Sequence, residues 1–271
     1  VFGLLTSERW EARVDETERG RVAGVTGVGR QAGIGFAIAR RLLDAGYRVL
    51  AHSLGPPDVE RPAGAGDDPE AVVATLDGYS DRLHQIEADL VDPAAPRRVI
   101  DAALGAFGAV DALVVNHAHS SDRSLVTATV EELDRAWAVN ARAAVLLTQA
   151  FAASHDDERP DGRIVLLTSG QHLGPMPGEL PYVLSKGAIH QATATLADEL
   201  AERGITVNAV NPGPVDTGWP SAGLREELTS RFPTGRMGRP DDIAPVVAWL
   251  LSSDSSWVTG QVIDAEGGFR R

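Results

Sequence analysis

The sequence contains no cysteine, which excludes disulfide bonds and thiolate metal sites. It has no apolar run long enough to cross a bilayer, so we expect no membrane-spanning segment. Residues 1–20 lack the charged-then-apolar order of a secretory signal, and because the chain does not begin with Met we expect it to have been trimmed or processed. The lack of cysteine is compatible with a reducing compartment, and we expect the protein to be cytoplasmic.

Positive charge is also scarce, since 25 Lys and Arg residues stand against 38 Asp and Glu residues, a net charge of −13. This balance disfavours a nucleic-acid surface and long-range attraction to a very acidic partner, although a local basic patch could override it. With 271 residues, 43% of them hydrophobic, one α/β domain can take the whole chain. We interpret residues 1–20 as a surface extension and residues 21–271 as that domain.

Short apolar runs alternate with helical patterns, which predicts an α/β fold with a doubly wound parallel sheet. The predicted strands cover residues 21–26, 47–51, 85–90, 110–115, 164–167, 205–210 and 260–264. The predicted helices cover residues 34–45, 70–82, 96–108, 130–153, 182–203 and 241–252.

A glycine-rich turn separates the first strand from the first helix. Gly27 and Gly33 lie in this turn, and Ile34 and Gly35 open the helix. Glycine permits positive φ and lets the backbone approach a pyrophosphate, whose charge is stabilised at a helix N-terminus. A glycine turn alone is more often structural, but its position between a strand and a helix favours a dinucleotide-binding site.

The second predicted strand ends without the carboxylate that NAD-preferring sites usually place there to bind the ribose hydroxyls. Arg30 in the glycine turn is placed to meet a 2′-phosphate, with His52 and Ser53 as helpers, so the sequence favours NADP(H) over NAD(H). A solvated turn residue is the alternative for Arg30. Asp89 and Leu90, at the end of the third strand, are candidate adenine contacts, and an exposed turn acid is an equal alternative for Asp89.

The fourth strand ends in Asn116-His117-Ala118-His119. Ligands bind beyond the carboxyl ends of parallel strands, so we expect Asn116 and Ala118 beside the cofactor. The His-x-His pair has no further ligand at a suitable spacing, and we expect no metal site. His119 is instead a candidate substrate contact or a polar loop residue.

Asn140 is a polar residue in an apolar helical neighbourhood. One interpretation is a buried amide that satisfies a backbone carbonyl. The other is that it holds a water molecule in a proton relay to Lys186.

A hydroxyl, a phenol and an amine follow the apolar run at 164–167. Ser169 comes just after this strand, and Tyr182 and Lys186 are four residues apart, so they share a helix face. A phenol normally ionises near pH ~10, and a neighbouring ammonium favours the phenolate. The pattern predicts proton transfer to or from a carbonyl or alcohol. An isolated Tyr-x-x-x-Lys is more often an ordinary helix surface.

The sixth strand is followed by a rigid turn at Pro212 and Gly213, which would expose backbone groups of Val215 to a ring amide, with the Thr217 hydroxyl nearby. Residues 216–240 are interpreted as a movable lid over a substrate cleft. Candidate substrate contacts, besides His119, are Gln171 and Trp219.

Together these motifs resemble the short-chain dehydrogenase/reductase family over about residues 20–269. The thirteen-residue gap between Ser169 and Tyr182 also suits that family. The chain looks most like bacterial 3-oxoacyl-[acyl-carrier-protein] reductase-like enzymes. The resemblance rests on Thr26-Gly27…Gly33-Ile34-Gly35, Asn116-x-Ala118, Asn140, Ser169, Tyr182-x-x-x-Lys186 and Pro212-Gly213-x-x-x-Thr217.

The resemblance implies a seven-stranded parallel sheet, usually in a homotetramer, and NADPH-dependent reduction of a ketone, 3-oxoacyl or related, to a secondary alcohol. Tyr182 would be the general acid/base, and Lys186 would lower its pKa and bind the nicotinamide ribose. Ser169 would orient the substrate oxygen, and Asn140 would complete the relay.

Three departures from the family pattern stand out. Five residues, and not three, separate Gly27 from Gly33, which puts the details of phosphate contact and cofactor preference in doubt. His117 and His119 stand in the usual Asn-Asn-Ala-Gly motif, and Thr168 precedes the serine.

Two other functions stay open. The first is an NAD(P)-dependent alcohol or sugar dehydrogenase that works in the oxidative direction. The second is a non-catalytic dinucleotide-binding protein, which the intact set of four catalytic-type residues disfavours. Whether an acyl carrier protein presents the small-molecule substrate is also open, because the net charge opposes it while four arginines could form a landing patch: Arg225, Arg231, Arg236 and Arg239.

Overall fold

The computed structural model describes residues 18–54, 72, 74–159 and 161–271. Seven strands form one sheet in the order β3-β2-β1-β4-β5-β6-β7, and every neighbouring pair is parallel. This confirms the predicted doubly wound sheet. The strands are β1 (Val22–Thr26), β2 (Arg48–Ser53), β3 (Leu83–Glu87), β4 (Ala112–Val115), β5 (Gly162–Leu167), β6 (Ile205–Asn211) and β7 (Val262–Asp264).

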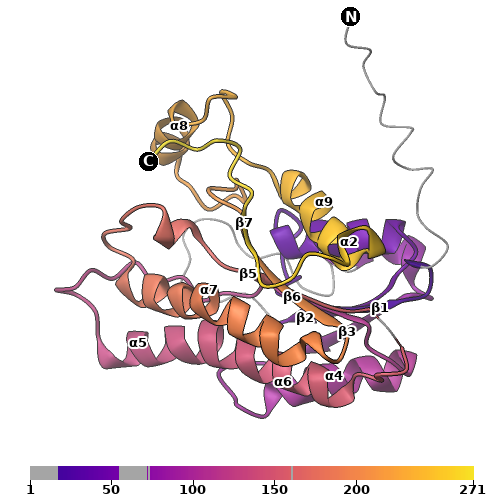
Figure 1. Cartoon of the computed structure of the whole chain (residues 1–271). Coiled ribbons are helices and arrows are strands. Elements are labelled where there is room, and N and C mark those ends of the chain that lie inside the picture. The colour runs from indigo at the N-terminus through magenta and orange to yellow at the C-terminus, as the bar shows by residue number, and fades with distance from the viewer. Residues whose placement is uncertain (1–17, 55–71, 73, 160) are drawn as a thin grey trace, which may run out of the picture.

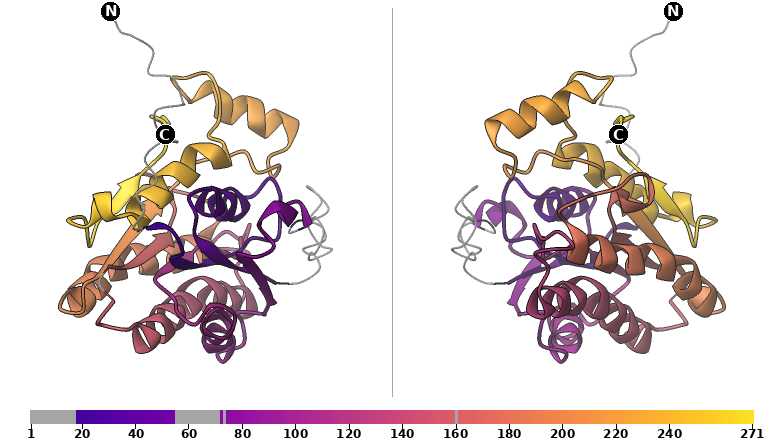
Figure 2. Two further views of the ribbon diagram at one scale, coloured as in Figure 1. Left: turned by 90° about the vertical axis from the view of Figure 1, so that its right-hand side faces the viewer. Right: turned by 90° about the vertical axis from the view of Figure 1, so that its left-hand side faces the viewer.

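Helices cover both faces of the sheet (Figure 1). One face carries α2 (Ile34–Asp44) and α9 (Pro240–Leu251), and the other carries α4 (Ala95–Phe107), α5 (Val130–Ala136), α6 (Ala143–Ser154) and α7 (Leu180–Ala201). Figure 2 shows the same layers from two sides, with α8 (Ala222–Ser230) standing apart from the sheet. No helix in the described ranges is long and apolar enough to span a membrane.

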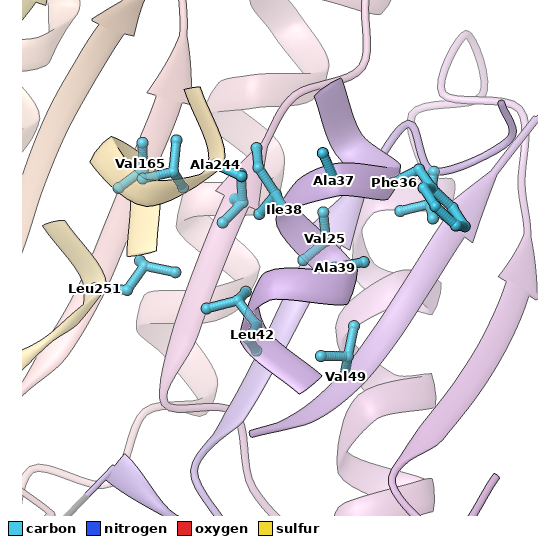
Figure 3. Close-up of a cluster of buried hydrophobic side chains, with 14 of the residues drawn as sticks. Val25, Phe36, Ala37, Ile38, Ala39, Leu42, Val49, Val165, Ala244 and Leu251 are labelled. Carbon is cyan, nitrogen blue, oxygen red and sulfur yellow. The ribbon is translucent and has the colours of Figure 1, made fainter. Parts of the chain in front are cut away.

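Each face of the sheet has its own hydrophobic cluster. In the first, Ile38 and Leu42 of α2 are fully buried with Val49 of β2 and Leu251 of α9 (Figure 3). The second cluster joins the opposite face to α4, α6 and α7. Because both faces are covered, β1, β4, β5 and β6 are buried at every position, which explains why their sequences are mostly apolar.

The edge strand β3 was predicted two residues too late. Its register with β2 pairs Val49 with Leu83 and Ser53 with Glu87, so the strand ends at Glu87 because its partner ends at Ser53. The predicted helix over 70–82 lies partly outside the described residues, and its described end is wrong, since a short 3₁₀ turn, η2 (Asp77–Tyr79), leads into β3.

The helical stretch 130–153 is continuous but not uniform. Between α5 and α6 the chain forms a π-helical segment, η3 (Trp137–Arg142), which contains Asn140. Such segments are rare and occur often at functional sites. The helix α8 was not predicted. The structure describes the predicted N-terminal extension, residues 1–20, only from Glu18 onward. Glu18 is buried and accepts hydrogen bonds from the Tyr47 hydroxyl and, at 2.9 Å, from Ser253 N.

Candidate active site

The loops that follow β1, β4, β5 and β6 meet at one edge of the sheet, because all strands run in the same direction. The strand order reverses between β1 and β4, and a ligand crevice in such sheets opens at this point. The predicted site residues of the glycine turn, of the strand ends and of the start of α7 therefore face a common region.

The glycine turn is packed too tightly for side chains. Gly27 has φ +75°, and a Cβ on Gly35 would lie 2.3 Å from the Gly27 carbonyl oxygen and 2.6 Å from Asn116 Nδ2. A Cβ on Gly33 would lie 2.9 Å from the carbonyl oxygen of Arg30. Gly33 caps α2 without a side-chain hydrogen bond, and the first turn, which begins at Ile34, has no acidic residue. A helix N-terminus without a side-chain cap, next to a glycine turn whose backbone carries no side chains, fits the pyrophosphate of a dinucleotide.

Asn116 and His117 fasten this turn to the end of β4. Asn116 Nδ2 donates to the carbonyl oxygens of Thr26 (3.0 Å) and Gly27 (3.2 Å). His117 Nδ1 lies 2.8 Å from Thr26 Oγ1, and His117 Nε2 lies 2.8 Å from the carbonyl oxygen of Val139. A carbonyl can only accept, so Nε2 carries the proton. Burial lowers the pKa of His117 to about 3, and the imidazole is neutral.

The residues expected near the adenosine lie at the end of β2 and after β3. His52 is buried, with Nε2 2.9 Å from the Ala88 carbonyl oxygen and Nδ1 3.4 Å from Gly27 N, so its ring supports the glycine turn. Ser53 is beside Gly29, whose added Cβ would lie 3.4 Å from Ser53 Cβ.

The two residues after β3 differ in placement. Asp89 is exposed, and its carboxylate accepts from Val91 N at 2.9 Å, which closes a local turn. Leu90 is buried in the second hydrophobic cluster.

Asn140 uses its whole amide for protein contacts. Its Oδ1 accepts from His119 N (2.7 Å), and its Nδ2 donates to the His119 carbonyl oxygen (2.9 Å) and to Ser185 Oγ (2.9 Å). Ser185 Oγ in turn donates to the Tyr182 carbonyl oxygen (2.8 Å). The buried amide thus joins the loop after β4 to the turn of α7 between Tyr182 and Lys186. Asn140 Nδ2 thus satisfies a backbone carbonyl, as one of the two interpretations expects, and the proton relay stays a prediction.

Tyr182 and Lys186 lie on one face of α7. Lys186 is 2% exposed, its Nζ lies 5.9 Å from the centre of the Tyr182 ring, and it donates to the carbonyl oxygen of Leu167 at 2.7 Å. Burial lowers the pKa of Lys186 to about 8. Because Leu167 ends β5, this bond places the ammonium beside the loop that carries Ser169.

Ser169 is half-buried and begins the 3₁₀ turn η4 (Gly170–His172) without a side-chain capping bond. The preceding Thr168 is buried and donates from Oγ1 to the Lys186 carbonyl oxygen at 3.1 Å, which attaches α7 to the end of β5. Gln171 reaches back to Thr168 Oγ1 at 3.4 Å. Lys186 Nζ and the backbone of Ser169 therefore lie at the same strand end, and Tyr182 is one turn before Lys186 on α7.

The loop after β6 completes this edge of the sheet. Gly213 has φ +63°, and its N–H donates to Asn211 Oδ1 at 3.0 Å, with Pro212 between them. Val215 is buried, and its carbonyl oxygen accepts from Thr217 N (3.1 Å) and from Trp219 Nε1 (2.8 Å). Trp219 remains 42% exposed.

The comparisons with known proteins agree with this geometry. Residues 27–270 match the family model described as enoyl-(acyl carrier protein) reductase. The chain is 38% identical over 252 residues to the uncharacterised oxidoreductase YjdA of Bacillus subtilis, covering 93% of this chain and 97% of that protein. It is 36% identical over 258 residues to an Arabidopsis thaliana chloroplastic NADPH-dependent aldehyde reductase-like protein, covering 92% and 94%.

A solved dehydrogenase/reductase of Sinorhizobium meliloti has a TM-score of 0.82 at 32% identity, covering 96% of this chain and 98% of that chain. A short-chain dehydrogenase/reductase of Serratia marcescens, solved as a mutant, has a TM-score of 0.81 at 31% identity, covering 93% and 98%. The chain belongs to the short-chain dehydrogenase/reductase family. It is therefore an NAD(P)-dependent oxidoreductase that acts on small molecules, and the family predicted from the motifs is confirmed.

As a short-chain dehydrogenase/reductase, the chain departs from the family at the two histidines after β4. His117 takes a structural position beneath the glycine turn, as described above. His119 is half-buried, and its Nε2 lies 3.3 Å from Glu132 Oε2 of α5. Ala118, between the two histidines in the sequence, is exposed. Among the described residues, no group of three His, Asp or Glu side chains could hold a metal ion.

The arginines of residues 216–240 are mostly compensated. Arg225 pairs with Asp216 at 2.7 Å, Arg231 with Glu227 at 2.7 Å and Arg236 with Asp242 at 2.6 Å. Each pair lies within residues 216–242, so the segment presents less positive potential than its arginine content indicates.

Sequence reasoning gave no role to three residues that hold this short-chain dehydrogenase/reductase site together. Thr168, Ser185 and His117 each form a hydrogen bond that connects two of the converging loops. All three are direct neighbours of motif residues or belong to a motif, but the residue types alone do not predict which groups they bind.

Proposed function

We propose that this enzyme reduces a ketone or related carbonyl to a secondary alcohol with NADPH, with Tyr182 as the proton donor. The observation that carries the proposal is the buried ammonium of Lys186, 5.9 Å from the Tyr182 ring and bonded to the last residue of β5, next to Ser169. A bound nicotinamide dinucleotide supplies the hydride. The chain's own groups supply orientation and the proton.

In this proposal the Tyr182 Oη gives its proton to the substrate oxygen as that oxygen gains charge. The Ser169 hydroxyl donates a hydrogen bond to the same oxygen, and the Lys186 ammonium favours the phenolate left behind. Asn140 keeps Ser185 and the backbone of His119 in place, so that α7 cannot turn away from the loop after β4. His119, Gln171 and Trp219 are the proposed substrate contacts.

The same groups serve the reverse reaction, so an alcohol or sugar dehydrogenase is the second candidate. The names of two relatives, which are NADPH-dependent aldehyde reductase-type proteins of Arabidopsis thaliana, favour reduction. Turnover of a panel of aldehydes, ketones and 3-oxoacyl thioesters with NADPH, compared with turnover of the matching alcohols with NADP⁺, tests the direction.

Replacing Tyr182 by Phe tests the proton donor. A positioned acid contributes about 10²–10⁴-fold, so Y182F should lose that factor in kcat while NADPH still binds, as measured by fluorescence titration. Wild-type turnover by Y182F would refute the proposed mechanism. Ser169→Ala should lower kcat as well, without weakening NADPH binding.

The cofactor preference is proposed from the end of β2 and from the glycine turn. β2 ends in His52 and Ser53 without a carboxylate, Arg30 lies in the turn, and Ser53 lies beside Gly29. His52 binds backbone groups through both ring nitrogens and holds the turn in place. We propose the pyrophosphate contacts at Gly27, Gly33, Ile34 and Gly35, with Asn116, Ala118 and the loop Pro212–Thr217 along the rest of the dinucleotide.

Arg30→Ala should weaken NADPH binding and leave NADH binding nearly unchanged, because only NADPH carries the 2′-phosphate. Isothermal titration with both cofactors measures this difference, and NADH serves as the internal control. Tighter binding of NADH than of NADPH by the wild-type enzyme would contradict the assignment. Asp89, exposed after β3, remains the proposed adenine contact.

The substrate is proposed to be a free small molecule. The ion pairs of Arg225, Arg231 and Arg236 offset the charge that would attract an acidic carrier, and the net charge is −13. Equal turnover of a 3-oxoacyl group on a carrier protein and on a short thiol would support this. A strong preference for the carrier form that is lost on Arg231→Glu would contradict it.

Self-association to a homotetramer is proposed from large apolar side chains that remain exposed on α5, η3 and α7. Val130 of α5 is 67% exposed, Trp137 is 53% exposed and Leu184 of α7 is 53% exposed. A cluster of large apolar side chains on helices is typical of an interface. Sedimentation velocity would show a species of four chains, and Trp137→Glu should shift it to smaller species.

A further inference from the structure

The segment after β7, residues 264–271, lies against the end of α8. The rings of Phe269 and Phe232 contact each other with centroids 4.9 Å apart and their planes tilted by 47°, and Arg270 N donates to the Arg231 carbonyl oxygen at 3.1 Å. In Figures 1 and 2 this segment runs from the sheet toward α8. It therefore connects the lid region to the edge of the sheet where the active-site loops end.

Arg271 lies directly on the loop that carries Ser169. A Cβ on Gly170 would be 1.8 Å from Arg271 Nη2, and a Cβ on Gly174 would be 2.6 Å from Arg271 Cδ. Side chains at either position would displace the arginine. The Arg271 side chain thus contacts the loop from Ser169 to Gly174 at Gly170 and at Gly174, and the lack of a Cβ at these two positions makes the contact possible.

Glu266 holds Arg271 in this position. The carboxylate is on a residue that is 8% exposed, and it accepts two hydrogen bonds from the guanidinium, at 2.7 Å from Nη1 and 2.5 Å from Nη2. A bidentate arginine–carboxylate pair fixes both distance and orientation. The pair is therefore a rigid connection and more than a charge contact.

The same carboxylate is bonded to the loop after β6. Glu266 Oε1 accepts from Asn211 Nδ2 at 2.8 Å, and Asn211 Oδ1 accepts from Gly213 N at 3.0 Å. A Cβ on Gly213 would lie 2.9 Å from Glu266 Cβ, so this loop also packs against the side chain itself. Glu266 consequently touches both loops between which the nicotinamide end of the proposed cofactor site lies.

We propose that Arg271 and Glu266 form a clasp that sets the position of Ser169 relative to the loop at Pro212 and Gly213. Arg271 is a positioning residue, and Phe269 connects the clasp to the lid. The inference rests on the proposed function, because it assigns the clasp to the loop of the proposed substrate-orienting serine. A displacement of about 1 Å at such a group can cost on the order of 10²-fold in rate.

Arg271→Ala should lower kcat by about 10- to 100-fold and change the Kd for NADPH much less, because the glycine turn and α2 are not touched. Arg271→Lys keeps the charge and loses the bidentate geometry, so it should recover only part of kcat. The matched control is Arg97→Ala, which removes an arginine from the exposed pair with Asp101 on α4, at 2.7 Å, and should leave kcat unchanged.

A second variant displaces the clasp without removing charge. Gly170→Ala inserts a methyl group 1.8 Å from Arg271 Nη2 and 2.8 Å from Glu266 Oε1, and it should reduce kcat as Arg271→Ala does. In the double variant the methyl group occupies space that the guanidinium has left. The two effects should therefore be strongly non-additive, with a kcat close to that of Arg271→Ala alone.

The outcomes separate the clasp from the proposed function. Wild-type kcat in Arg271→Ala, or additive effects of Arg271→Ala and Gly170→Ala, would overturn the clasp even if Y182F is inactive. An active Y182F would overturn the proposed function whatever the clasp variants do. If Arg271→Ala fails to fold, Arg271→Lys and Gly170→Ala keep the positive charge at position 271 and the carboxylate of Glu266, and wild-type kcat in both would overturn the clasp.

Discussion

Lys186 is the only lysine among the 271 residues, so its protonation can be followed without interference from other lysines. The side chain is 2% exposed, and burial lowers its pKa from the ordinary value of 10.5 to about 8. Protein prepared with ¹³C-labelled lysine has one Cε resonance from this residue, whose shift against pH reports the titration. We expect a midpoint near pH 8 in the cofactor-free enzyme.

The same shift has a consequence for stability. Between the folded pKa and the unfolded pKa, the unfolded chain binds more protons than the folded chain, so the free energy of unfolding rises with pH in this window. From pH 7 to pH 10 the lysine contributes a rise of about 2.5 kcal/mol, worked from the two pKa values. Lys186→Met lacks this contribution, while all other titrating groups are shared.

Urea unfolding of the wild type and of Lys186→Met between pH 7 and pH 10 measures the difference. The stability of the wild type should increase relative to the variant by that amount across the range. Parallel curves for the two proteins, together with an NMR midpoint of about 10 or above, would show that the ammonium is well solvated. Burial would then not be what sets the pKa of Lys186.

Other predictions concern the glycine turn. Burial lowers the pKa of His117 to about 3, so the free energy of unfolding should fall as the pH drops below about 6.5, the pKa of a histidine in the unfolded chain. Between pH 7 and pH 4.5 this histidine accounts for a loss of about 2.5 kcal/mol, which His117→Asn should remove. Urea unfolding measures the difference. An unchanged acid slope would argue against a buried neutral imidazole. Gly35→Ala should destabilise the fold by about 1–3 kcal/mol and abolish NADPH binding, since its Cβ meets the Gly27 carbonyl oxygen at 2.3 Å. The control Gly105→Ala, on α4 with nothing within 4 Å, should stabilise by about 0.5–1 kcal/mol, and similar melting temperatures for the two variants would contradict the packing argument.

The sequence was sufficient for the fold because the strands and helices carry strong local patterns. The buried strands are mostly apolar, and the helix after the glycine turn has a clear apolar face at Ile38 and Leu42. Where burial is incomplete the prediction failed. The edge strand β3 has mostly exposed side chains, so its bounds follow from pairing with β2, which is a tertiary contact.

The motif residues of the site could also be found from spacing, because a helix places positions four apart on one face. The hydrogen bonds that hold these residues in place could not be predicted from the sequence. The π-helical segment at Asn140 has no sequence pattern of its own, and it lets the amide reach both His119 and Ser185. The contact of Arg271 with Gly170 joins residues about a hundred positions apart, and only the folded chain brings them together.

The single buried lysine in the middle of α7 also gives this protein an unusual pattern of proteolysis. A protease that cleaves only after lysine has one target bond in the chain, between Lys186 and Gly187, and the folded helix protects it. The rate of cutting under native conditions therefore reports how often this helix opens next to β5. A ligand that stabilises the closed helix would slow the cut in proportion to its occupancy, so two bands on a gel would be enough to compare cofactors and substrates.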